Sequence, residues 1–118
     1  MPVFVGGHEG INTYRIPSVT CTKNGTVLVF CEGRLNNNID GSPTHLVLKR
    51  SLNNTDPIEP PRLRHPRVGE PRSLNWNMTW EPMQILLHSR KREAWMNPVP
   101  VINSNDGTLF LLVNRYPN

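Results

Sequence analysis

Two arginines and one carboxylate stand at strand boundaries in this 118-residue sequence. Arg15 opens one β-rich segment, Arg34 follows the next, and Asp40 lies in the polar stretch before a third. If the first two segments form a hairpin, the guanidinium groups lie side by side at one sheet edge. They then repel each other unless an anion lies between them. Because a carboxylate matches the planar guanidinium fork, one interpretation is a site for a carboxylate-bearing ligand.

Local ion pairs are the alternative interpretation of the same two arginines. Glu32 lies two residues before Arg34, and Glu9 lies six residues before Arg15. Either acid could neutralise a guanidinium within the folded chain. The spacing alone leaves both interpretations open.

Short strands must carry these residues. Alternating and β-branched patterns predict an all-β antiparallel meander, in which residues 83–95 form a strand followed by a charged loop. Asn24-Gly25 and Asp106-Gly107 predict tight hairpin turns, because both dipeptides tolerate positive φ. The predicted strands are 15–22, 27–32, 45–50, 83–87, 99–103 and 108–114.

The two cysteines are expected to remain free thiols. A two-residue turn at Asn24-Gly25 would set Cys21 opposite Leu28 and Cys31 opposite Ser18, with the two sulfur atoms on opposite faces. We therefore predict no internal disulfide.

Residues 51–82 have the character of a Pro/Arg-rich insertion between the third and fourth strands. They hold six of the twelve prolines and little apolar sequence. A long segment of this kind is either an insertion or a functional loop. A solvated extended loop and a partner-binding segment are both open interpretations.

Charge and hydropathy exclude several classes. The net charge of +4 falls within residues 49–93, without the interleaved aromatic residues typical of nucleic-acid binders, so we expect no nucleic-acid partner. No apolar segment approaches about 18 residues, which predicts no transmembrane segment, and the first residues lack a signal-peptide pattern. The histidines, which are scattered over unrelated segments, predict no metal site; they are His8, His45, His65 and His88.

Several motifs, taken in order, resemble the N-terminal portion of the exo-alpha-sialidase (neuraminidase) family. Residues 73–80 (SLNWNMTW) also resemble the family's Asp box, with Asn75 in place of the aspartate and Asn77 in place of the glycine. The ordered motifs are Tyr14-Arg15-Ile16-Pro17, Glu32-Gly33-Arg34, Asp40, HLVLKRS at 45–51, WMNPVP at 95–100 and DGTLFLL at 106–112.

This resemblance implies a six-bladed β-propeller of the sialidase type. At roughly 40–50 residues per blade, residues 1–118 would cover about one and a half blades at the N-terminal end. Residues 51–82 would be an insertion in the connection between strands 3 and 4 of the first blade. The missing blades would come from the rest of a parent chain, since open blade edges otherwise invite aggregation.

The resemblance also implies roles for five residues. Asp40 matches the acid/base, Arg15 and Arg34 match substrate-binding arginines, and Met96 and Asn97 match residues that line the pocket for the sugar's substituents. Sialidases are retaining glycosidases with a tyrosine nucleophile, and no cofactor is implied. In the family, the nucleophile lies beyond the positions matched by this chain, so the 118 residues alone are expected to be inactive.

Two functions rank ahead of a third, which is nucleic-acid binding through the basic residues of 51–82. One is an exo-alpha-sialidase that removes terminal sialic acids from glycoproteins, gangliosides and oligosaccharides. The alternative is a non-catalytic propeller-type module that binds acidic glycans or proteins. The resemblance leaves the compartment open among cytoplasmic, lysosomal and membrane-associated.

Overall fold

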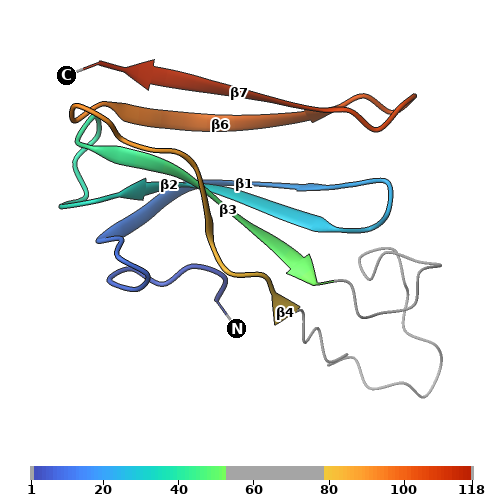
Figure 1. Ribbon diagram of the computed structural model, residues 1–118, viewed down its shortest axis with the longest axis horizontal. Helices are drawn as coiled ribbons and strands as arrows, with labels where there is room; N and C mark the ends of the chain where they lie inside the picture. Colours follow the sequence, from blue (N-terminus) through green and yellow to red (C-terminus); the bar gives the residue numbers. More distant parts are fainter. Residues whose placement is uncertain (1, 53–78, 118) are drawn as a thin grey trace.

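The structure, a computed structural model, describes residues 2–52 and 79–117. Within these residues it is built from strands without helices, which confirms the predicted all-β class (Figure 1). Accordingly, no described segment forms a helix long and apolar enough to cross a membrane. The strands are β1 (Thr13–Cys21), β2 (Val27–Arg34), β3 (Thr44–Leu52), β4 (Thr79–Trp80), β5 (Gln84–Leu87), β6 (Ala94–Ile102) and β7 (Leu109–Tyr116).

The strands form an antiparallel sheet with a hairpin attached to it. Neighbouring strands in the sheet follow the order β1, β2, β3 and β5, and β4 pairs with the end of β3. β6 and β7 form an antiparallel hairpin that joins β3 through one parallel pair, Thr44 with Ala94. Figure 1 shows this hairpin lying along the β1–β2–β3 sheet.

The hairpin is held against the sheet by an apolar core. Leu28, Phe30 and Leu48 lie on one face of β2 and β3, and Leu111 of β7 packs against them. Burial of a leucine or phenylalanine side chain stabilises a fold by about 1.5–3 kcal/mol. This core therefore fixes the β6–β7 hairpin against β2 and β3.

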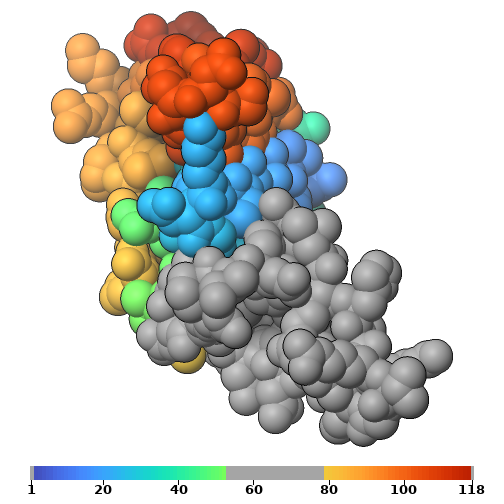
Figure 2. Space-filling view, turned by 90° about the vertical axis from the view of Figure 1, so that its right-hand side faces the viewer, coloured from blue at the N-terminus to red at the C-terminus, as the bar shows by residue number. Residues whose placement is uncertain are grey.

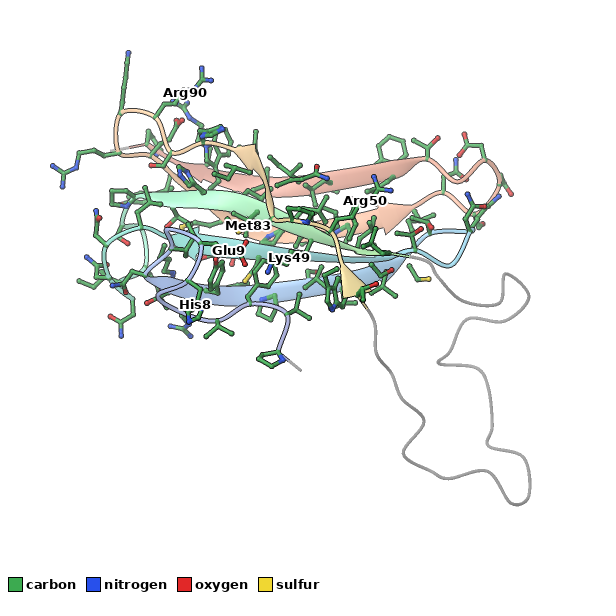
Figure 3. All side chains as sticks on the ribbon, turned by 60° about the horizontal axis from the view of Figure 1, so that its bottom comes forward. His8, Glu9, Lys49, Arg50, Met83 and Arg90 are labelled. Carbon is green, nitrogen blue, oxygen red and sulfur yellow. The ribbon has the colours of Figure 1, made fainter. Side chains whose placement is uncertain are left out.

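The N-terminal segment lies on the other face of the sheet. Ile11 is buried, and a side chain at Gly33 would come within 3.1 Å of its Cδ1 atom. The Lys49 ammonium donates to the Glu9 carboxylate at 2.5 Å (Figure 3). Glu9 is thus the partner of Lys49 and not of Arg15, which removes one of the two acids considered as a local partner for the arginines.

The first hairpin turn is longer than the sequence predicts. Thr22 and Thr26 close a turn in which Gly25 has φ 84°. Cys21 therefore pairs with Val27, and the predicted register opposite Leu28 is wrong.

The corrected register changes the placement of the thiols. Val27 and Cys31 lie on the same face of β2, because they are an even number of residues apart. Cys21 and Cys31 therefore share a face, which contradicts the predicted opposite faces. They remain free thiols, separated by four positions along the ladder, or about 13 Å, which is beyond the reach of a disulfide.

Other boundaries also differ from the prediction. β6 begins five residues before the predicted 99–103, and β3 and β4 extend into both ends of the predicted insertion 51–82. Residues 53–78, and with them most of the segment 73–80 that resembles an Asp box, lie outside the described residues.

The second turn runs from Asn103 to Thr108, so it is also longer than a two-residue turn. Figure 2 shows its tip above the β1–β2 tip, where Lys23 approaches Gly107.

Candidate active site

Matching bulges interrupt β1 and β6 before a proline. In β1 the register shifts between Arg15 and Ser18, and in β6 it shifts between Met96 and Val99. Ile16 and Asn97, which precede Pro17 and Pro98, both have φ 55°.

This backbone is costly at both positions. A non-glycine residue at positive φ costs about 1–3 kcal/mol, and a following proline disfavours helical backbone further. β1 and β6 are in contact. Glu32, which lies opposite Arg15 in the β1–β2 ladder, also accepts from the Asn97 amide, so the two bulges lie near each other. Bulges re-aim side chains, and strained bulges of this kind cluster at functional sites.

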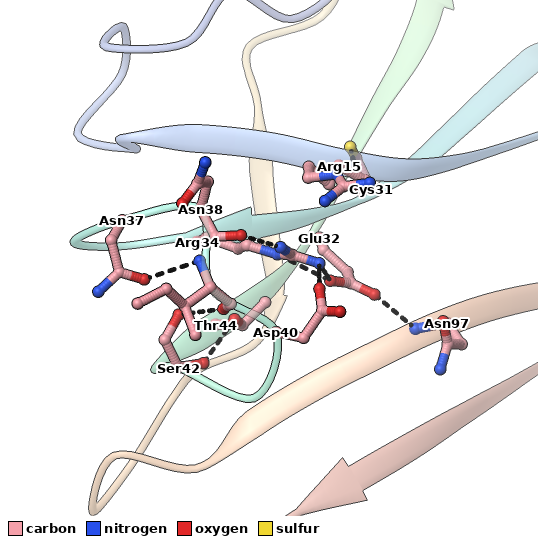
Figure 4. Close-up of polar contacts among 11 residues, drawn as sticks. Arg15, Cys31, Glu32, Arg34, Asn37, Asn38, Asp40, Ser42, Thr44 and Asn97 are labelled. Carbon is pink, nitrogen blue, oxygen red and sulfur yellow. Dashed lines mark hydrogen bonds and ion pairs between the residues drawn. The ribbon is translucent and has the colours of Figure 1, made fainter.

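Arg34 lies at the end of β2 with 1% of its surface exposed. Its Nη2 atom lies 3.0 Å from Glu32 Oε1 and 2.7 Å from Asp40 Oδ1. Its Nη1 atom donates to the Asn38 carbonyl (Figure 4). The guanidinium is therefore shared by two carboxylates, and the alternative of a local acid partner describes Arg34 correctly.

Asp40 reaches Arg34 from the loop between β2 and β3. Its side chain is 76% exposed, and Oδ1 alone pairs with a described residue. Gly41 follows it with φ 79°, and Ser42 donates to the Ile39 carbonyl at 2.8 Å. The loop thus presents one oxygen to Arg34 and leaves Oδ2 without a partner among the described residues.

Glu32 is fully buried between the first sheet and β6. Oε1 accepts hydrogen bonds from Arg34 Nε and Nη2, while Oε2 accepts from the backbone amide of Asn97 at 2.9 Å. Buried charges are tolerated when they are paired in this way. A continuous polar network therefore runs from Asp40 through Arg34 and Glu32 to the bulge of β6 (Figure 4).

Arg15 lies opposite Glu32 in the backbone register of the β1–β2 ladder, two positions from the opposed residues Thr13 and Arg34. Arg15 is exposed, and among the described residues no side-chain hydrogen bond or ion pair involves its guanidinium. The Cys31 thiol donates to the Arg15 carbonyl at 3.0 Å. Burial raises the pKa of Cys31 to about 12, so this thiol serves as a neutral donor beneath the bulge.

The structure thus brings together four of the five predicted site residues by direct contact or chain adjacency. Arg34 and Asp40 are paired, Asn97 joins them through Glu32, and Met96 precedes Asn97. The fifth, Arg15, lies opposite Glu32 in the ladder, and among the described residues no hydrogen bond or ion pair joins its guanidinium to Asp40.

Glu32 links Arg34 to the Asn97 bulge, whereas the sequence suggested only a local ion pair for it. A signal was present, because Glu32 shares a strand face with Phe30 of the core, and a charge on a core face requires partners. Within the described ranges, no group of three or more His, Cys, Asp or Glu residues is placed to hold a metal ion.

Two curated proteins match most of this sequence. The exo-alpha-sialidase of Arthroderma benhamiae is 32% identical over 105 residues, which is 89% of this chain and 22% of the relative. The exo-alpha-sialidase of Aspergillus fumigatus is 30% identical over 105 residues, or 89% of this chain and 21% of the relative. This chain is a relative of the exo-alpha-sialidases. It spans about a fifth of their length, and no family model matches it.

The sheet order agrees with this relationship. β1, β2, β3 and β5 form one four-stranded antiparallel unit, and β6 and β7 begin a second that packs against it. The arrangement is that of a sialidase β-propeller fragment covering about a blade and a half.

Proposed function

We propose that the chain forms part of an exo-alpha-sialidase that removes terminal sialic acids from glycoproteins, gangliosides and oligosaccharides. In this proposal Asp40 is the acid/base, and Arg15 binds the carboxylate of the sugar. Met96 and Asn97 line the pocket for its substituents. The observation that carries the proposal is the exposed Asp40 carboxylate, held by Arg34 at 2.7 Å beside a strand on which the Arg15 guanidinium has no partner among the described residues.

The proposed chemistry follows from this arrangement. Asp40 Oδ2 is the oxygen left for a ligand, so it would protonate the glycosidic oxygen and then take a proton from the attacking water. Arg34 presents almost no surface to a ligand while Asp40 is in place, and its substrate contact would come through that carboxylate. A tyrosine nucleophile, characteristic of sialidases, would come from another part of the whole protein.

Arg15 offers the direct test of substrate recognition. N-acetylneuraminic acid and its methyl ester are titrated into the isotope-labelled 118-residue chain, and binding is followed by NMR. The free acid is expected to shift the amides around Arg15 and Met96, whereas the ester, which lacks the anionic carboxylate, is not. Arg15→Lys keeps the charge but loses the planar fork, so its affinity should fall about tenfold.

Arg50→Lys is the matched control, because Arg50 is a half-exposed arginine whose partner is Glu81. It should leave the affinity unchanged. Equal binding of acid and ester, or equal affinity of wild type and Arg15→Lys, would contradict the proposal. Binding of the free acid by a complete protein that hydrolyses no sialoside would instead support the non-catalytic glycan-binding alternative.

A further inference from the structure

The bulges of β1 and β6 are secured in different ways. In β1 a neutral thiol, Cys31, donates to the Arg15 carbonyl. In β6 a buried carboxylate, Glu32, accepts from the amide of Asn97, a residue 65 positions away in sequence. The β1 bulge forms next to an uncharged thiol, so a bulge of this shape does not need a charged neighbour. The charge of Glu32 beside Asn97 therefore requires a separate explanation.

The Asn97 amide requires an acceptor. The register shift takes it out of the β6–β7 ladder, and an inward-facing amide without a partner is costly. Glu32 Oε2 supplies a charged acceptor, which makes a hydrogen bond roughly twice as strong as a neutral one. This bond offsets part of the strain of the positive φ at Asn97.

The other oxygen of Glu32 controls the opposite end of the network. Oε1 accepts two hydrogen bonds from Arg34, which in turn pairs with Asp40. One side chain therefore fixes the position of the Asp40 carboxylate relative to the Asn97 bulge. Glu32 itself has 0% exposure, so it acts through its neighbours and touches no ligand.

We infer that Glu32 is a positioning residue that locks the Asn97 bulge of one blade to the Asp40 carboxylate of the preceding blade. The inference rests on the proposed function for its biological meaning, because it sets the distance between the acid/base and the pocket for the sugar. Its structural content is independent of catalysis and can be measured in the 118-residue chain.

Amide hydrogen exchange provides the measurement. Glu32→Gln keeps the shape but removes the charge, and Glu32→Asp keeps the charge but withdraws it from Asn97. Each variant should raise the exchange rate of the Asn97 amide about tenfold. Amides in the core of β2 and β3 should change much less, whereas a loss of global stability would accelerate all protected amides together.

Glu93→Gln is the matched control. Glu93 is buried, and it accepts from the Arg90 amide at 3.3 Å and from Arg115 Nε at 2.7 Å. It therefore bridges an amide and a guanidinium as Glu32 does. This substitution should accelerate exchange at Arg90 and leave Asn97 unchanged.

The outcomes separate the inference from the proposed function. Unchanged exchange at Asn97 in both Glu32 variants overturns the inference, whether or not the chain binds N-acetylneuraminic acid. Faster amide exchange confined to Asn97 in the Glu32 variants, together with about tenfold weaker binding of N-acetylneuraminic acid by these variants, supports both the inference and the proposed function. Selective acceleration in a chain whose wild type binds no sugar supports the lock and contradicts the proposed function.

Discussion

Arg34→Met tests how much the buried network stabilises the chain. Methionine replaces the stem of Arg34 but removes its charge, which leaves the Glu32 carboxylate buried with the Asn97 amide as its remaining described partner. Breaking a buried ion pair from one side costs about 3–5 kcal/mol. Asp40 adds little to this cost, because its side chain is 76% exposed and returns to solvent.

The expected cost is a large fraction of the stability of a small domain, which is about 5–15 kcal/mol. Urea unfolding followed by circular dichroism measures it. With a slope near 2 kcal/mol per molar urea, the midpoint should fall by about 2 M. Arg50→Met is the control, because Arg50 and Glu81 are 3.6 Å apart with side chains 46% and 32% exposed. Loss of such a surface pair costs about 0–1 kcal/mol.

A second substitution identifies the cause of the loss. Glu32→Gln combined with Arg34→Met removes both buried charges and keeps an oxygen that can accept from the Asn97 amide; an uncharged amide is far less costly to bury than an unpaired carboxylate. The double variant should therefore recover most of the stability lost in Arg34→Met. The reasoning is refuted if Arg34→Met costs no more than Arg50→Met, or if the double variant is less stable than the single one.

Two further predictions concern thiol reactivity and pH. Because burial raises the pKa of Cys31 to about 12, a thiol reagent at pH 8 should label the half-exposed Cys21 first and Cys31 only on unfolding; Cys21→Ala should abolish the fast phase. Burial, together with His88, lowers the pKa of His45 below its ordinary 6.5. The unfolded chain therefore binds the extra proton first, and stability should fall as pH drops through about 6.5. The melting temperature should decrease between pH 7.5 and 5.5, and a smaller decrease in His45→Gln would assign the effect to this ring; an equal decrease would not.

The strand pattern could be predicted because it depends on local sequence. Period-2 alternation and two glycine turns placed β1, β2, β3, β5 and β7 to within a few residues. The hairpin registers could not be predicted as well, because Asn24-Gly25 and Asp106-Gly107 lie inside longer turns. The first half of β6 was missed because Asn97-Pro98 has the composition of a turn, whereas in the fold it forms a bulge.

The candidate site shows the same division between local and long-range information. The contacts of Arg34 with Glu32 and Asp40 join residues close in sequence, and one of them was anticipated as a local ion pair. The bond from Asn97 to Glu32 joins residues 65 positions apart. It depends on how β6 packs across β2, which side-chain spacing along one chain does not encode.

A chimera tests the central claim, that Asp40 is the acid/base of a sialidase site, most directly. This chain replaces the 105 matching residues of the Arthroderma benhamiae exo-alpha-sialidase, and hydrolysis is measured for an aryl sialoside and a galactose-linked sialoside. The chimera should hydrolyse both. Asp40→Asn should slow the galactose-linked substrate, which has the poor leaving group, by about 10²- to 10⁴-fold and the aryl substrate far less, while Asp106→Asn in the β6–β7 turn should slow neither. A folded but inactive chimera, or equal slowing of both substrates by Asp40→Asn, would contradict the claim.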